Sequence, residues 1–299
     1  MNRFPVVRKA VIPAAGFGTR FLPFSRAVPK EMLPLVDKPV IQYVVEEAAA
    51  SGIEEILIIV SDGKEAIRNH FSPAVELEKR LAGKNRTAEL AELDRIDRLA
   101  KLHYVRQDDL NGLGGAMQLA REFAGNDPVA VLLGDTVVTG HGKPVTAQLC
   151  DAWRQTGASV FAVEEVPPDK VSRYGIIRPA AIPDGPLYRV ADLVEKPAAA
   201  DAPSRLAIAS RYLFTPGIFA ALAETLPDQN GEIQLSDAMR RLIATEPLYA
   251  LRFAGRRHDI GNKLDFMKST VEFGLRRPEF RDALAEFICN QARELEKNV

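Results

Sequence analysis

The sequence predicts an α/β protein whose central sheet is mostly parallel and is flanked by helices. Two observations predict this class. The first sixty residues follow the order strand, glycine-rich loop, helix, strand, and the alternation of strands and helices continues to about residue 133. The middle of the chain is then richer in strand-like segments, and helices return toward its end.

The first unit consists of two short apolar strands joined by a helix. Residues 10–12 and 55–60 are expected to be buried strands, because each is a short run of apolar residues beside turn signals. Between them, the apolar positions of 39–51 suit a helix, with Pro39 in its first turn and Gly52 as its C-terminal cap. Such a unit normally pairs its strands in parallel, which predicts a Rossmann-like sheet.

Later segments are expected to extend this sheet. Residues 64–101 should form exposed helices, because their many Glu, Lys and Arg residues mix both signs of charge. Strands are predicted at 103–106, 129–133, 158–165, 175–178, 187–194, 206–214 and 248–253, and helices from 113 and at 216–225, 235–244, 263–276 and 278–296. Proline-containing loops separate the strands of the middle part, which we interpret as a β-rich insertion.

The composition excludes several classes of protein. The 299 residues include 39 Lys+Arg and 40 Asp+Glu, a net charge of −1, and 46% of them are hydrophobic. Such a chain is not disordered, and it is not held on nucleic acid by bulk charge. Two cysteines and four scattered histidines supply neither a disulfide framework nor a zinc-type cluster. Without an apolar run of 18 residues, we expect a cytoplasmic protein with no membrane partner.

A glycine-rich loop follows the first strand directly. Open parallel sheets bind ligands at the carboxyl ends of their strands, where bare glycine backbone exposes N–H groups. Residues 13–23 (PAAGFGTRFLP) lack the Gly-Lys-Ser/Thr of a Walker loop and the third glycine of a dinucleotide fingerprint. Two cations, Arg20 and Lys30, bracket the end of this loop. Surface charges beside an ordinary turn are the alternative, and the apolar and proline-containing context of Lys30 in PKEMLP makes that alternative the weaker one.

Short motifs run in one order along nearly the whole chain. After the loop at 13–23 they are PKEMLP (29–34), VRQ (105–107), GLG (112–114), LGD (133–135), RYG (173–175), VEKP (194–197), RYLFTP (211–216), GEIQLSDA (231–238) and HDIGNKL (258–264). Together they resemble the nucleotidyltransferases that join a nucleoside triphosphate to a sugar 1-phosphate. The likeness is strongest to the bacterial UTP–glucose-1-phosphate uridylyltransferases, also called UDP-glucose pyrophosphorylases.

This resemblance implies Mg²⁺-dependent transfer of a uridylyl group from UTP to glucose 1-phosphate, with release of pyrophosphate. The alternatives are the same chemistry with dTTP or another sugar 1-phosphate, and a low-activity paralogue that binds nucleotide-sugars. A degraded paralogue would be expected to lose Arg20, Lys30, Asp135 or Lys196, and all four are present. The family usually has His where Gly115 stands, which puts the contacts of that imidazole in doubt here.

The resemblance also implies roles for particular residues. Arg20, Lys30 and Lys196 are the expected catalytic cations, and Asp135 and Asp259 are the expected Mg²⁺ ligands. Asp135 ends a predicted buried strand, although aspartate after glycine is also common in ordinary turns. The expected nucleotide-binding residues are Ala14, Ala15, Gly16, Gly18, Thr19, Arg20, Glu31, Gln107 and Gly112. The expected sugar-phosphate-binding residues are Gly175, Glu195 and Lys196.

No linker divides the chain cleanly, so residues 1–299 are expected to form a single domain. Within it, about 1–140 is the expected nucleotide-binding half and about 141–262 the sugar-phosphate half. Residues from about 263 to 299 are the expected C-terminal helices. Because the family tends toward dimers and tetramers, these helices are candidates for the contacts of a homodimer or homotetramer.

Overall fold

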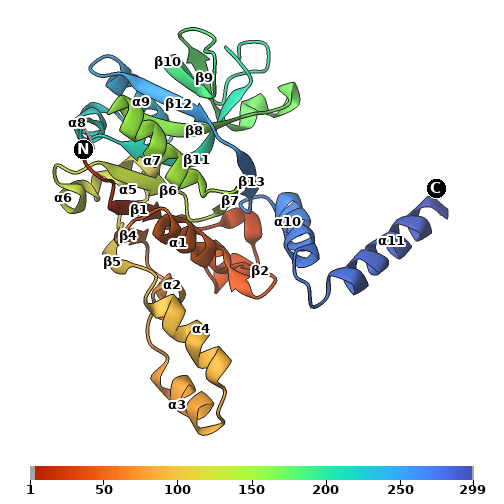
Figure 1. The fold of residues 1–299 in the computed structure, drawn as a ribbon. Coiled ribbons are helices and arrows are strands. Elements are labelled where there is room, and N and C mark those ends of the chain that lie inside the picture. Colours follow the sequence, from red (N-terminus) through yellow and green to blue (C-terminus); the bar gives the residue numbers. More distant parts are fainter. Residues whose placement is uncertain (1–3, 298–299) are drawn as a thin grey trace.

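The computed structural model describes residues 4–297. Its core is a nine-stranded sheet, in the order β5-β4-β1-β6-β11-β8-β12-β10-β9 (Figure 1). These strands are β1 (Lys9–Pro13), β4 (Glu55–Val60), β5 (Lys101–Arg106), β6 (Val129–Leu132), β8 (Ser159–Glu165), β9 (Gly175–Pro179), β10 (Leu187–Glu195), β11 (Leu206–Phe214) and β12 (Leu248–Arg252). Strands β10 and β11 run opposite to the others. The predicted mixed, mostly parallel α/β sheet is therefore confirmed.

Both faces of the sheet are covered by helices. Side chains alternate along a strand, so Ala10 and Ile12 of β1 pack in one apolar cluster and Val11 packs in the other. The first cluster includes side chains of α1 (Val40–Ala50) and α7 (Val145–Thr156). The second includes side chains of α5 (Gly112–Gln118), α6 (Arg121–Ala124), α8 (Gly217–Glu224) and α9 (Leu235–Ile243). This double burial explains why the central strands are continuously apolar.

Helix α7 is not among the elements predicted from the sequence, which include none between residues 133 and 158. Pro144 precedes the helix, and Gly157 ends it in the left-handed conformation. Proline before a helix and glycine after it are typical boundary signals. The local signal for this helix was therefore present in the sequence.

Several elements lie outside the central sheet. The segment predicted as exposed helices contains α2 (Glu65–His70), α3 (Val75–Gly83) and α4 (Thr87–Asp97). Short strands β2 (Pro34–Leu35) and β3 (Lys38–Pro39) pair with each other, and 3-10 turns lie at Thr19–Phe21, Phe24–Arg26, Lys30–Met32 and Pro168–Arg173. A second two-stranded ladder joins β7 (Thr136–Gly140) to β13 (Gly255–Asp259). It sets Asp259 opposite Thr136, which places Asp259 beside the end of β6.

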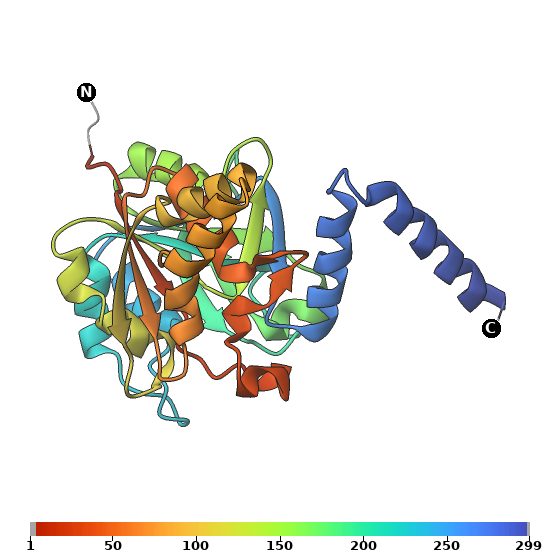
Figure 2. The same cartoon turned by 90° about the horizontal axis from the view of Figure 1, so that it is seen from below.

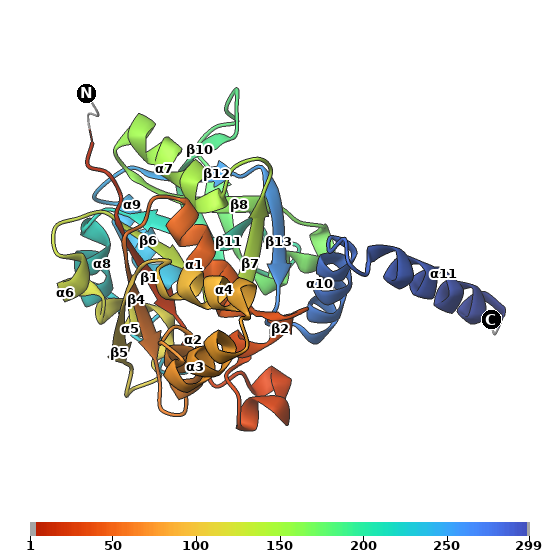
Figure 3. The same cartoon turned by 60° about the horizontal axis from the view of Figure 1, so that its bottom comes forward.

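Two segments project from the body. Helices α3 and α4 form a hairpin that extends away from the sheet in Figure 1. At the C-terminal end, α10 (Lys263–Leu275) lies against β13 and β2, whereas α11 (Arg281–Lys297) points away from the body in all three views (Figures 1, 2 and 3). Helix α11 buries no residue, and Phe287 and Leu295 are exposed on it. Among the described helices, none is long and apolar enough to cross a membrane.

A buried histidine joins α10 to the rest of the fold. His258 of β13 is 2% exposed, and its ring lies 3.2 Å from the hydroxyl of Ser269 and against Phe273. Burial lowers the pKa of His258 from its ordinary value of 6.5 to about 4, and Arg256 and Arg276 act in the same direction against Glu272. The folded protein therefore holds this imidazole neutral at pH values where the unfolded chain protonates it.

We expect His258 to make the protein less stable in weak acid. The unfolded chain binds this proton below about pH 6.5 and the folded chain only near pH 4, so folding stability falls across that window. Between pH 7 and 4.5 the loss from this residue is about 2–3 kcal/mol. Urea unfolding at both pH values should show a smaller loss for His258→Gln than for the natural sequence. An equal loss in both proteins would contradict this role of the imidazole.

Candidate active site

The loops at the carboxyl ends of β1, β5 and β6 enclose a cavity of about 440 Å³. A second cavity of about 290 Å³ adjoins it, and Leu113, Leu133 and Asp135 line both. Asp135 comes three residues after the last residue of β6, a strand buried along its whole length. The carboxylate of Asp135 thus lies where the two cavities meet.

Side chains from outside the glycine-rich loop after β1 donate hydrogen bonds to its carbonyl groups. The hydroxyl of Ser61 donates to the carbonyl of Ala15 at 2.6 Å, and the ammonium of Lys64 donates to the carbonyl of Gly16 at 2.9 Å. Gly18 adopts a left-handed φ of +66°. Within residues 4–297, no protein group accepts a hydrogen bond from the N–H groups of residues 15–18. Those four donors remain available to a ligand, as in a backbone nest that binds anions.

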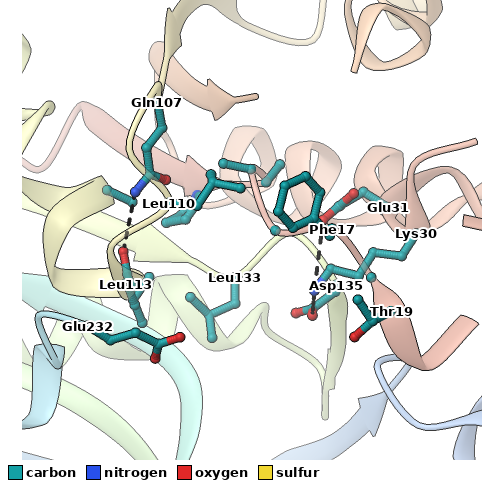
Figure 4. Close-up of a pocket in the computed structure, with 17 residues that line it drawn as sticks. Phe17, Thr19, Lys30, Glu31, Gln107, Leu110, Leu113, Leu133, Asp135 and Glu232 are labelled. Carbon is teal, nitrogen blue, oxygen red and sulfur yellow. Dashed lines mark hydrogen bonds and ion pairs between the residues drawn. The ribbon is translucent and has the colours of Figure 1, made fainter. Parts of the chain in front are cut away.

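Four charged side chains alternate in sign along the loop. The ammonium of Lys64 lies 2.7 Å from Glu31, which is 4.0 Å from Lys30, and the Lys30 ammonium lies 2.5 Å from Oδ2 of Asp135 (Figure 4). Burial would raise the pKa of Asp135, but Lys30 outweighs it and keeps that pKa below its usual value. The Asp135 carboxylate is therefore charged at neutral pH. The pKa of Glu31 is raised by its burial, against the opposing effect of Lys64 and Lys30.

Gln107 lies at the opposite end of the first cavity from Lys30 and Asp135 (Figure 4). Its side chain is 5% exposed, and its amide nitrogen faces three oxygens: the carbonyl of Asp109 at 3.0 Å, Oδ1 of Asn111 at 3.2 Å and the carbonyl of Gly112 at 3.5 Å. With the nitrogen so surrounded, the amide oxygen is the atom left to contact a ligand. Ala14, Ala15, Gly16, Gly18, Thr19, Glu31 and Gly112 line the same cavity.

The second cavity contains the other predicted group, Gly175, Glu195 and Lys196. The ammonium of Lys196 lies 3.2 Å from Glu195. A Cβ on Gly175 would lie 2.9 Å from Ile208 and 3.1 Å from Glu195, so a larger residue at 175 would displace these two side chains. Arg20 lies elsewhere, on a third hollow that it shares with Lys30 and Asp135. The sequence-predicted residues are therefore all brought to one connected region.

Lys64, Arg257, Gln234 and Ser236 are among the residues of this region that sequence reasoning missed. The guanidinium of Arg257 donates a hydrogen bond to Glu164, and its central carbon lies 4.2 Å from the centre of the Tyr174 ring. The hydroxyl of Ser236 is buried on the second cavity and has no hydrogen-bond partner within the described residues. Lys64 follows a glycine at the start of an apparently exposed helix, so its sequence context indicated a surface charge.

Asp135 and Asp259 offer a place for a hard cation. A Cβ on Gly261 would lie 3.2 Å from Oδ1 of Asp259 and 3.5 Å from Oδ2 of Asp135, so both carboxylates face the same small space. Burial raises the pKa of Asp259, with Arg257 opposing and the negative charge of Asp135 adding to it. Residues 4–297 hold no group of three or more metal-type side chains. Two carboxylates suit a divalent ion that completes its shell with water and phosphate oxygens.

A mixed sheet with an anion-binding loop, two adjoining cavities and paired carboxylates is typical of enzymes that act on nucleotides. A sequence model described as "Nucleotidyl transferase" matches residues 9–273. The chain therefore belongs to the nucleotidyl transferase family. Members of this family generally use a divalent metal ion.

Within that family the chain is similar to the bacterial UTP–glucose-1-phosphate uridylyltransferases, as the sequence motifs predict. It is 47% identical to the Bacillus subtilis enzyme over 282 residues, which cover 94% of this chain and 96% of the relative. It is 46% identical to the Streptococcus pneumoniae enzyme over 292 residues, 97% of each chain.

Solved structures agree with this placement. A UTP-bound UGPase from Acinetobacter baumannii matches with a TM-score of 0.88 and 36% identity, over 95% of this chain and 99% of that one. A UDP-glucose pyrophosphorylase complexed with UDP-glucose matches with a TM-score of 0.83 and 38% identity, over 91% of this chain and 100% of that one.

Proposed function

We propose that this protein transfers the uridylyl group of UTP to glucose 1-phosphate, which yields UDP-glucose and pyrophosphate. The observation that carries the proposal is the pair of cavities that meet at Asp135. The first takes the nucleotide and the second takes the sugar phosphate. The α-phosphorus and the attacking phosphate oxygen then come together at their junction.

The reaction requires positive charge more than it requires a base. The attacking phosphate oxygen is already an anion at neutral pH, so catalysis depends on alignment and on reducing the repulsion between two anions. Arg20 and Lys30 bind the triphosphate together with the free N–H groups of the glycine-rich loop. Lys196 holds the sugar phosphate, and Glu195 accepts hydrogen bonds from sugar hydroxyls.

We assign the divalent ion as Mg²⁺, held by Asp135 and Asp259. Two carboxylates that face one small space suit Mg²⁺, a hard cation that prefers oxygen ligands, better than a softer metal. Bound there, the ion supplies positive charge that offsets the charge of the phosphates. Lys30 keeps Asp135 ionised and therefore ready for this role.

The base-binding end of the first cavity favours uracil. Along its edge, uracil offers two carbonyl oxygens with an N–H donor between them. Gln107 presents an acceptor, and the N–H groups of Ala15 and Gly112 supply donors that no described residue uses. A site of fixed polar groups rejects a wrong base because one buried group is then left unpaired.

Initial rates of pyrophosphate release with a panel of nucleotides test the proposal. At subsaturating nucleotide and excess glucose 1-phosphate, we expect kcat/KM to decrease in the order UTP, dTTP, CTP, with purine triphosphates poor. The kcat/KM for CTP should be about ten- to a hundredfold lower than that for UTP. If dTTP or CTP exceeded UTP, the uridylyltransferase assignment would be wrong. UDP-glucose binding without pyrophosphate release would instead indicate a low-activity paralogue.

We also propose that the protein is a homodimer or homotetramer whose subunits meet through α11. The exposed Phe287 and Leu295 lie on a helix that contacts the rest of its own chain mainly through α10. Burial of such apolar surface between two copies would be favourable. Light scattering should show that Phe287→Asp with Leu295→Asp halves the molar mass or lowers it to that of a monomer. Ile182→Asp, at an exposed loop position, is the matched control.

A further inference from the structure

We propose that Asn111 is a positioning residue for base selection. Its side chain holds the amide of Gln107 in one orientation, and it occupies a space that is open because residue 115 is glycine. The inference deepens the proposed function and rests on it, because it concerns how this site distinguishes uracil from cytosine. Neither Asn111 nor Gly115 is among the residues that line the nucleotide cavity. Both therefore act through Gln107 rather than by touching the ligand.

The orientation of the Gln107 amide is determined by what surrounds its nitrogen. That nitrogen has two hydrogens, and its two nearer partners are the carbonyl of Asp109 at 3.0 Å and Oδ1 of Asn111 at 3.2 Å. The carbonyl of Gly112, at 3.5 Å, lies at the outer limit of a hydrogen bond and does not replace Asn111. If the amide turned over, its oxygen would face those oxygens instead, and a buried acceptor would be left without a donor. The Asn111 side chain supplies one of the three and is the one that a substitution can remove.

Asn111 reaches Gln107 because Gly115 has no side chain. A Cβ on Gly115 would overlap the Oδ1 and Cγ atoms of Asn111. The main chain of Asn111 is held separately, since its N–H donates to Asp109 at 2.8 Å and its carbonyl accepts from Ile233 at 2.7 Å. A methyl group at 115 would therefore displace the Asn111 amide, the free end of a short side chain, more readily than the backbone.

The held amide has a direct consequence for the base. With its nitrogen bonded to the protein, Gln107 presents only an acceptor, which matches the N3–H of uracil. Cytosine carries a lone pair at N3, so two acceptors would face each other. An amide free to turn over can donate to N3 of cytosine and thus accommodates it. Release of the amide should therefore weaken the binding of UTP and raise kcat/KM for CTP relative to that for UTP.

The experiment compares kcat/KM for UTP and CTP in Asn111→Ala, Gly115→Ala and the double variant. We expect each single variant to lower the UTP/CTP ratio about tenfold, mainly through a higher KM for UTP. The double variant should resemble Asn111→Ala alone, because the new methyl group then enters space already vacated. Gly83→Ala, in a helix with open space around the added Cβ, is the matched control and should leave the ratio unchanged.

Asn111→Asp keeps an acceptor at the same place and should retain most of the selectivity, which also covers the case in which the alanine variants fold poorly. An unchanged ratio in the folded alanine variants would overturn the proposal. So would additive losses in the double variant, or loss of selectivity in Asn111→Asp. A natural-sequence protein that does not use UTP would instead refute the proposed function, and that result is obtained first.

Discussion

Replacement of Asp135 by asparagine is expected to lower turnover about 10²–10³-fold, the scale for removal of one group that stabilises a transition state. The carboxylate lines all three hollows of the site and forms an ion pair with Lys30. An amide of the same size preserves the packing at the end of β6 but is a poor ligand for Mg²⁺. The loss should therefore be in catalysis rather than in folding.

The measurement is the initial rate of pyrophosphate release over a range of Mg²⁺ concentrations, with circular dichroism to verify the fold. Asp127→Asn, which removes an exposed carboxylate that pairs with Lys9, is the control and should keep its activity. The decisive condition is limiting Mg²⁺. If the folded Asp135→Asn protein turned over there at nearly the natural rate, the metal assignment would be refuted.

Loss of the buried guanidinium of Arg211 is expected to have the largest effect on stability. Arg211, on β11, is completely buried and donates to Glu47 of α1 at 2.8 and 2.9 Å, to the carbonyl of Thr136 and to that of Ser210. The other oxygen of Glu47 accepts from Thr146 of α7. Arg211→Met would leave the buried carboxylate of Glu47 without its cationic partner, which should cost about 3–5 kcal/mol.

Urea unfolding at neutral pH checks this expectation. Arg211→Met with Glu47→Leu should recover much of the lost stability, because no buried charge is left without a partner. Arg205 and Glu165 form an exposed pair, so Arg205→Met should cost less than about 1 kcal/mol. Equal losses in Arg211→Met and Arg205→Met would mean that the buried cluster contributes no more than a surface pair.

The parts of the fold that could be predicted are those with strong local signals. Strand β4 and helix α1 agree with the prediction to within a residue, because their apolar periodicity and their flanking proline and glycine lie within one short segment. The β7–β13 ladder could not be predicted in this way. Its two strands lie more than a hundred residues apart, and neither has a strand-like apolar pattern that indicates its partner, since β13 is polar and charged apart from its glycine.

The candidate site likewise contains residues that local sequence signals indicate and residues that they do not. The glycine-rich loop and the Gly-Asp at the end of β6 could be recognised as candidates because each follows a predicted buried strand. Lys64 could not, because its contact with Glu31 joins residues 33 positions apart and depends on how α2 lies against the loop. The space shared by Asn111 and Gly115 is equally invisible in the sequence, where the glycine is only a departure from the family pattern.

Leu113, Leu133 and Asp135 line both cavities, and this shared lining has a consequence for release of the proposed product. UDP-glucose is a nucleoside and a sugar joined by a diphosphate, so under the proposed function it would occupy both cavities at once. When one half detaches, the other keeps it nearby at an effective concentration of about millimolar, and rebinding is favoured. Dissociation then requires both halves to be free together. Under the proposed function, accumulated product should therefore compete with UTP as well as with glucose 1-phosphate.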